Sequence, residues 1–211
     1  MKKLSIKEVY LTIQGEGFHT GRPAVFIRFT GCNLWSGLEK DRKNAICNWC
    51  DTDFIGTDGE LGGKYTEHQL ANIVKKLWES NLTYNPYVIL TGGEPLLQVN
   101  SSLLQKLHSF GFEIGLETNG TRPIPDGIDW VCVSPKSGTD IILKKGNELK
   151  FVYPQKNVVP DIYQNLEFDH FYIQPMDGLY QKKNTDLSKQ YILKNTRWKL
   201  SLQTHKILGI P

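Results

Sequence analysis

Residues 87–95 read YVILTGGEP, an apolar run followed by two glycines, a glutamate and a proline. The run from Tyr87 to Thr91 has the composition of a strand that is covered on both faces, as in a parallel sheet. In barrels of parallel strands, ligand-binding residues follow the carboxyl ends of the strands. Paired glycines let backbone groups approach a ligand closely, although Gly-Gly-x-Pro alone is more typical of a turn into a helix. The stretch therefore predicts an α/β fold and marks a candidate site that needs support from other motifs.

Other short apolar runs predict further strands. They cover residues 24–29, 112–117, 130–134, 148–153, 170–174 and 198–202. A capping box of Thr66 and Gln69 begins a helix with Leu70, Val74 and Trp78 on its apolar face, and a second helix is predicted over about 100–110. Weaker helical patterns lie near 158–165 and 187–195. About seven strands with only three or four helices predict a single domain over residues 1–211, a reduced or open (β/α) barrel.

The composition excludes several classes of function. The chain has 211 residues, with 25 Lys plus Arg against 22 Asp plus Glu, and a net charge of +3 is too small to indicate nucleic-acid binding. No apolar run approaches the length of a membrane span, and the first residues, MKKLSIKEVYLTI, lack the apolar core of a signal peptide. The sequence thus predicts a cytoplasmic protein that acts on a small molecule, with no nucleic-acid and no membrane partner. In the cytosol, its four cysteines favour metal or catalytic roles over disulfides.

Three of these cysteines lie in a glycine-rich loop over residues 31–64. A loop of this length is uncommon unless it has a function or binds something that orders it. Cys47 and Cys50 have the two-residue spacing of a metal chelate, and 14 residues separate Cys32 from Cys47. A structural zinc site with Cys132 as the fourth ligand is one interpretation. Against it, Cys132 lies within an apolar predicted strand, like a buried core residue, and three thiolates would leave one iron of a cubane cluster open to a ligand.

With further motifs, these features resemble the radical S-adenosylmethionine (SAM) superfamily and, within it, the 7-carboxy-7-deazaguanine synthase family. The motifs are Gly31-Cys32-Asn33-Leu34, Cys47-Asn48-Trp49-Cys50, Gly92-Gly93-Glu94-Pro95, Ile13-Gln14-Gly15-Glu16-Gly17, Cys50-Asp51-Thr52, Glu117-Thr118-Asn119-Gly120, Ser134-Pro135-Lys136, Gln174-Pro175-Met176-Asp177 and Gln203-Thr204-His205-Lys206. The resemblance covers essentially the whole chain. The chain departs from the superfamily in the long gap between Cys32 and Cys47, an expansion that the synthase family is known to include.

The resemblance implies an open radical-SAM barrel, with residues 31–64 as the cluster-binding loop and a role for each motif. It implies a [4Fe-4S] cluster on Cys32, Cys47 and Cys50, with S-adenosyl-L-methionine on the fourth iron and Mg2+ on Thr52. The implied cofactor-binding residues are Asn48, Trp49, Cys50, Gly92, Gly93, Glu94, Glu117, Asn119, Ser134, Pro135, Lys136, Gln174, Pro175, Met176 and Asp177. The implied substrate-binding residues are Ile13, Gln14, Gly15, Glu16, Arg28, Thr91, His205 and Pro211, the last through a terminal carboxylate. No side chain is expected to be the catalyst, because the cluster and SAM carry the radical chemistry.

Three of these residues have a second interpretation. Arg28 also fits a half-exposed strand, although a planar guanidinium beside the cluster loop suits a substrate carboxylate. Thr52 could cap the loop instead of binding Mg2+, and His205 could be a surface residue.

The implied reaction converts 6-carboxy-5,6,7,8-tetrahydropterin to 7-carboxy-7-deazaguanine and ammonia, a carbon–nitrogen lyase step toward the queuosine precursor. The implied partners are the pterin substrate, an electron donor such as flavodoxin or ferredoxin, and a second copy of the chain in a homodimer. Two alternatives stay open. One is a glycyl-radical activase, which is not expected to carry both the Gln14 and the His205 segments, and the other is a zinc-binding module without catalysis.

Overall fold

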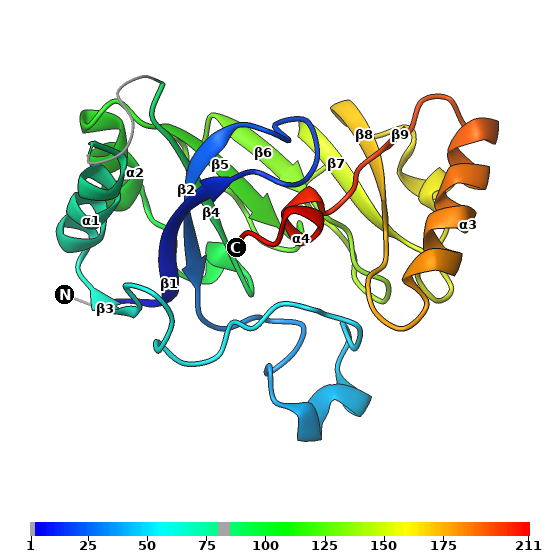
Figure 1. The fold of residues 1–211 in the computed structure, drawn as a ribbon, viewed down its shortest axis with the longest axis horizontal. Coiled ribbons are helices and arrows are strands. Elements are labelled where there is room, and N and C mark those ends of the chain that lie inside the picture. The colour runs from blue at the N-terminus through cyan, green and yellow to red at the C-terminus, as the bar shows by residue number, and fades with distance from the viewer. Residues whose placement is uncertain (1–2, 80–84) are drawn as a thin grey trace.

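The computed structural model of the chain describes residues 3–79 and 85–211. Within these residues, nine strands form one sheet in the order β3-β1-β2-β4-β5-β6-β7-β8-β9 (Figure 1). The strands are β1 (Leu4–Ile13), β2 (Pro23–Phe29), β3 (Gly63–Tyr65), β4 (Tyr87–Gly92), β5 (Glu113–Thr118), β6 (Trp130–Val133), β7 (Lys145–Tyr153), β8 (Glu167–Pro175) and β9 (Lys199–Leu200). Neighbouring strands from β2 to β9 are parallel, whereas β1 runs antiparallel to both β2 and β3. The predicted open α/β barrel with few helices is confirmed, with an antiparallel edge.

The register of the parallel strands brings their carboxyl ends to one rim of the sheet. Arg28 of β2 lies opposite Thr91 of β4, and Leu90 of β4 lies opposite Leu116 of β5. Farther along the sheet, Thr118 pairs with Val133. Side chains just after these strands therefore meet at the same rim, which is where the sequence motifs place the candidate site.

Helices pack against two parts of the sheet and bury two apolar cores. Helices α1 (Glu67–Glu79) and α2 (Ser101–Ser109) cover the sheet near β1, β2, β4 and β5, while α3 (Gln181–Lys194) covers β7, β8 and β9. The first core includes Leu70, Val74 and Leu104 from the helices, and the second includes Phe151 and Trp198. The predicted capping box forms, because Thr66 and Gln69 exchange backbone and side-chain hydrogen bonds at the start of α1.

Several predicted elements differ from the structure. Strand β1 was not among the predicted strands, because Lys7 and Glu8 interrupt its apolar alternation, and both side chains form ion pairs with the cavity region described below. The predicted helix near 158–165 is only a short 3-10 helix, η3 (Pro160–Tyr163), and α3 begins six residues before the predicted 187. The predicted strand over 198–202 pairs only at Lys199 and Leu200. The short elements outside the predictions are strand β3, helix α4 (Thr204–Leu208) and the 3-10 helices η1 (Glu39–Asn44) and η2 (Pro95–Leu97).

The segment after β1 and the segment after β9 meet in front of the sheet, where Figure 1 places α4. The carbonyl of Gly15 accepts hydrogen bonds from the backbone N–H and the hydroxyl of Thr204, each at 2.9 Å. Near the end of the chain, the hydroxyl of Thr12 donates to the carbonyl of Pro211 at 2.9 Å. Parts of the chain that are remote in sequence thereby bridge the open side of the barrel. No helix in the described residues is long and apolar enough to cross a membrane.

Candidate active site

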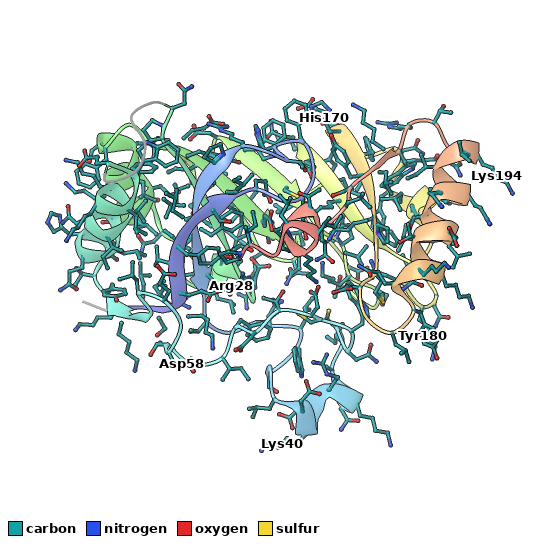
Figure 2. The ribbon with its side chains drawn as sticks, viewed as in Figure 1. Arg28, Lys40, Asp58, His170, Tyr180 and Lys194 are labelled. Atoms are coloured by element: carbon teal, nitrogen blue, oxygen red, sulfur yellow. The ribbon has the colours of Figure 1, made fainter. Side chains whose placement is uncertain are left out.

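A cavity of about 380 Å3 opens at the carboxyl ends of the parallel strands. The turn after β4, the end of β5, the segment after β6 and the end of β8 form its floor and sides. The segment after β1, the second half of the loop over residues 31–64 and the segment after β9 close it from the front. Arg28, which Figure 2 labels, is one of the residues that line this cavity. The strand-end motifs of the sequence thus share one cavity.

Two of the three predicted cluster ligands lie at the cavity wall formed by the long loop, and the third lies behind the turn after β4. Cys47 and Cys50 line the cavity, and their thiols are hydrogen-bonded to each other, which lowers the pKa of Cys50 to about 6 and raises that of Cys47. Cys32 lies behind Gly93, since a Cβ on this glycine would be 2.9 Å from the Cys32 Cβ atom. All three thiols are free of disulfides. Three free thiols beside a backbone turn without side chains fit the ligand set of a cluster with one open iron.

Cys132 occupies a different environment from the one that its sequence neighbours predict. It is buried, as expected, but it lies outside the apolar clusters and lines the cavity. Burial raises the pKa of its thiol, and the charged groups that act on it are Glu148, Lys150, Glu117 and Glu16. The described residues contain no group of three His, Cys, Asp or Glu side chains arranged to hold a single metal ion.

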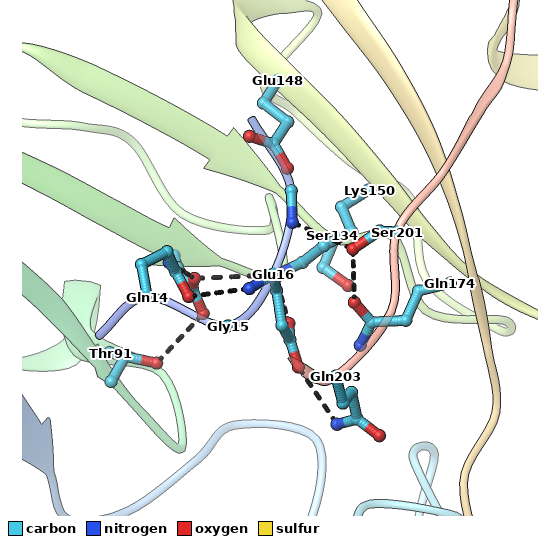
Figure 3. A network of polar contacts seen from close by, with 12 residues as sticks. Gln14, Gly15, Glu16, Thr91, Ser134, Glu148, Lys150, Gln174, Ser201 and Gln203 are labelled. Atoms are coloured by element: carbon cyan, nitrogen blue, oxygen red, sulfur yellow. Dashed lines mark hydrogen bonds and ion pairs between the residues drawn. The ribbon is translucent and has the colours of Figure 1, made fainter. Parts of the chain in front are cut away.

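A buried ionic network forms the floor of the cavity (Figure 3). Lys150 of β7 forms ion pairs with Glu16 at 2.5 Å and with Glu117 at 3.5 Å. Gln14 donates to Glu117 at 3.0 Å, and Gln203 donates to Glu16 at 3.0 Å. Burial alone would lower the pKa of Lys150, but the two carboxylates outweigh it and raise this pKa well above its usual value.

Arg28 lies on the cavity wall with its guanidinium held from β1. Its Nε donates to Glu8 at 2.7 Å, and its Nη2 donates to the hydroxyl of Tyr10 at 2.8 Å. A guanidinium has five N–H donors, so these two bonds orient the group and leave donors for a further partner. The guanidinium is therefore fixed at the cavity wall with donors available for a further partner.

Glu94 has a structural position just beneath the cavity surface. Its fully buried carboxylate accepts hydrogen bonds from the backbone N–H of Leu96 at 3.0 Å, the hydroxyl of Thr118 at 2.8 Å and the backbone N–H of Asn119 at 2.8 Å. It ties the turn after β4 to the end of β5. Asp177 of the later motif does not itself line the cavity but pairs at 2.6 Å with Lys206, which does.

Most of the predicted site residues lie on the cavity wall. The predicted residues that do not line it are Cys32, Asn48, Glu94, Pro135, Pro175, Met176 and Asp177. Sequence reasoning missed several residues that do line it, namely Lys7, Glu8, Tyr10, Phe26, Asp51, Asp53, Thr118, Cys132, Lys150, Val152, Gln203 and Lys206. For Lys150 a signal was available, because a lysine between the apolar residues Leu149 and Phe151 of a predicted strand is unusual unless it has a buried partner.

Comparisons with known proteins agree with this geometry. The model of the Radical SAM superfamily matches residues 43–152. A 7-carboxy-7-deazaguanine synthase of Bradyrhizobium diazoefficiens is 54% identical over 98% of this chain and 98% of its own length. Another synthase, from Bordetella pertussis, is 50% identical over 98% of this chain and 99% of its own length. The crystal structure of QueE from Escherichia coli has a TM-score of 0.72 at 24% identity, covers 95% of this chain and 93% of that chain, and shows the same fold.

Proposed function

The chain belongs to the 7-carboxy-7-deazaguanine synthases of the radical SAM superfamily, and from this premise we propose that it converts 6-carboxy-5,6,7,8-tetrahydropterin to 7-carboxy-7-deazaguanine and ammonia. The observation that carries the proposal is the cavity in which the cysteine loop, the Gly-Gly turn and the segments after β1 and β9 meet. The enzyme is a radical SAM lyase that acts on a small molecule and needs a reductant. Family membership favours this function over a glycyl-radical activase or a zinc-binding module.

The cofactors are a [4Fe-4S] cluster, SAM and Mg2+. We propose Cys32, Cys47 and Cys50 as the cluster ligands, supported by the close approach of Cys32 to Gly93 and by the cavity that Gly93, Cys47 and Cys50 line together. When bound, the cluster and SAM supply the electron transfer and the hydrogen abstraction that protein side chains cannot perform. Thr52 lines the same cavity between Asp51 and Asp53, and its oxygen would be a ligand for Mg2+, which prefers oxygen donors.

Other residues of the cavity would bind SAM through polar atoms that the fold already orients. Gly92 and Gly93 present backbone groups, and the backbone there tolerates no side chain, because a Cβ on Gly93 would collide with the carbonyl of Gly31. Lys136 is half-buried and donates to the carbonyl and hydroxyl of Ser134 at 2.8 and 2.6 Å. The further SAM-binding residues in the proposal are Asn48, Trp49, Glu94, Glu117, Asn119, Pro135, Gln174, Pro175, Met176 and Asp177.

The substrate would lie between the segment after β1 and Arg28. The guanidinium, held by Glu8 and Tyr10, would bind the pterin carboxylate, and the amide of Gln14 is oriented by Glu117. Burial lowers the pKa of His205, so its ring is neutral near pH 7 and can both donate and accept a hydrogen bond. The other proposed substrate contacts are Ile13, Gly15, Glu16, Thr91 and Pro211, each of which lines the cavity.

The wider setting is part of the proposal. We place the enzyme in the cytoplasm as a homodimer, with the whole chain acting as one radical SAM domain and residues 31–64 as its cluster-binding loop. Its reductant would be a small electron carrier such as a flavodoxin or a ferredoxin.

Anaerobic reconstitution with iron and sulfide tests the proposal. The protein should become brown and, with dithionite and SAM, should convert the carboxypterin to a product with the mass of 7-carboxy-7-deazaguanine. Replacing Cys32, Cys47 or Cys50 by Ala should abolish the brown absorbance, whereas the matched variant Cys132→Ala should keep it. A brown protein that leaves the pterin unchanged would refute the synthase function, and a colourless protein that binds zinc stoichiometrically would refute the cluster.

A further inference from the structure

Arg42 lies in the expanded part of the cluster loop and reaches back to the cysteine pair. Residues 33–46 form a lobe below the sheet that contains the 3-10 helix η1 (Glu39–Asn44), with Lys40 near its tip (Figure 2). Arg42 extends from this helix, and its side chain is only 29% exposed. Nothing in the proposed reaction uses this residue.

The guanidinium of Arg42 connects three parts of the loop. Its Nη1 donates to the carbonyl of Asn48 at 3.1 Å and to the carbonyl of Cys50 at 3.0 Å. On its other edge, Nε and Nη2 donate to both carboxylate oxygens of Glu39 at 2.8 and 2.5 Å. Its face lies 4.0 Å from the ring centre of Trp35, which is buried and packs edge-on against Phe54.

These contacts define the shape of the turn that presents the cysteines. Asn48 is the first residue between Cys47 and Cys50, and the second carbonyl belongs to Cys50 itself. One nitrogen that bonds both carbonyls restrains the turn across its length. Arginine is suited to this because its planar fork can bond two acceptors on one edge and a carboxylate on the other while it stacks on an aromatic ring. The ammonium group of a lysine is not planar and has no second edge with which to bind a carboxylate.

On the basis of the proposed cluster ligation, we propose that Arg42 is a positioning residue that holds the Cys47–Cys50 turn in its cluster-binding shape and raises the reduction potential of the cluster. A positive charge near a cluster favours the reduced state, which carries one more electron. Glu39 opposes this effect, because its carboxylate pairs with the same guanidinium. Since the Glu39 side chain is 75% exposed, solvent screens it more than it screens Arg42.

The two residues of the pair therefore make predictions of opposite sign. Arg42→Gln removes the positive charge and should shift the midpoint potential to a more negative value. Glu39→Gln leaves the positive charge uncompensated and should shift it to a more positive value. Arg42→Lys keeps the charge but loses the double carbonyl contact, so it should lose iron to a chelator faster than the wild-type protein while its potential changes less than that of Arg42→Gln.

The experiment compares these variants with Lys43→Gln, which removes a charge from an exposed position on the same helix. Each protein is reconstituted anaerobically, its iron content and its rate of iron loss to a chelator are measured, and its midpoint potential is determined by an EPR-monitored redox titration without substrate. Thermal unfolding of the cluster-free proteins reports whether each variant folds. Lys43→Gln is expected to match the wild-type protein in iron retention and to change the potential less than Arg42→Gln.

The results separate this inference from the proposed function. A wild-type protein that assembles no cluster refutes the cluster assignment itself. If the wild-type protein assembles the cluster but Arg42→Gln and Lys43→Gln shift the potential equally, the effect is general surface charge and the inference is wrong. Shifts of the same sign for Arg42→Gln and Glu39→Gln, or iron retention in Arg42→Lys equal to that of the wild-type protein, also refute it.

Discussion

Replacing Lys150 by Met tests whether the floor of the cavity depends on one buried cation. The side chain is 5% exposed, and it pairs with Glu16 and Glu117, which are 14% and 25% exposed. Methionine has a similar volume but leaves both carboxylates buried without their cation. Breaking a buried ion pair by removing one partner costs about 3–5 kcal/mol of unfolding free energy. For a chain of this size, that loss lowers the melting temperature by roughly 6–20 °C.

The difference in stability between the wild-type protein and Lys150→Met should depend on pH. In the wild-type protein, burial raises the pKa of Glu16 but Lys150 outweighs it, so the pKa of Glu16 is lowered. Such a group stabilises the fold above its unfolded pKa of about 4.5, and this contribution is lost as the pH falls. Without Lys150, burial dominates the pKa of Glu16 and raises it. In the variant, Glu16 therefore takes up a proton as the pH falls, which removes its unpaired buried charge. The stability difference between the two proteins should therefore shrink from about pH 7 to about pH 5.

Thermal and urea unfolding of the cluster-free proteins measure this difference, with a double-mutant cycle of Lys150→Met and Glu16→Gln. The double variant should be more stable than Lys150→Met alone, because it buries one unpaired carboxylate fewer. Lys136→Met is the comparison variant, since Lys136 is half-buried and its hydrogen bonds go to Ser134 rather than to a carboxylate, and it should lose less stability. A loss below about 1 kcal/mol for Lys150→Met, or a loss independent of pH, would contradict the reasoning.

Two further substitutions test the packing around the cavity. Gly17→Ala places a Cβ against the carboxylate of Glu148, at a residue whose φ is +66°. It should lower the melting temperature more than Gly111→Ala, because Gly111 has a similar φ of +82° but a Cβ there meets open space. Equal losses of melting temperature would show that backbone conformation alone is responsible. Glu94→Gln should lower the free energy of unfolding by about 1–3 kcal/mol, because the amide of glutamine would face the N–H of Asn119 in place of an acceptor. It should also weaken SAM binding, which calorimetry measures. An unchanged free energy of unfolding and SAM affinity would show that this carboxylate does not hold the turn.

The predicted strands correspond to the sheet because uniformly apolar runs have few alternatives to a doubly covered strand. Residues 87–91 and 24–29 lie within β4 and β2, and their motifs meet because parallel register aligns the strand ends. Two kinds of information were beyond the sequence. The pairing of β1 with β2 depends on contacts between distant segments, and the neighbours of Lys150 are known only once β7 has a place in the sheet.

Several of the polar residues that interrupt apolar strands line the cavity. Lys7 and Glu8 interrupt β1, and each forms an ion pair there, with Asp53 and Arg28 respectively. In β7, Lys150 and Val152 are two residues apart, so they point to the same face of the sheet, and both line the cavity. A charged side chain in such a strand is stable only with a partner of opposite charge, because burial penalises an isolated charge. A lysine or arginine inside an apolar strand of this fold therefore predicts a carboxylate on a neighbouring segment, and both Arg28 and Lys150 have one.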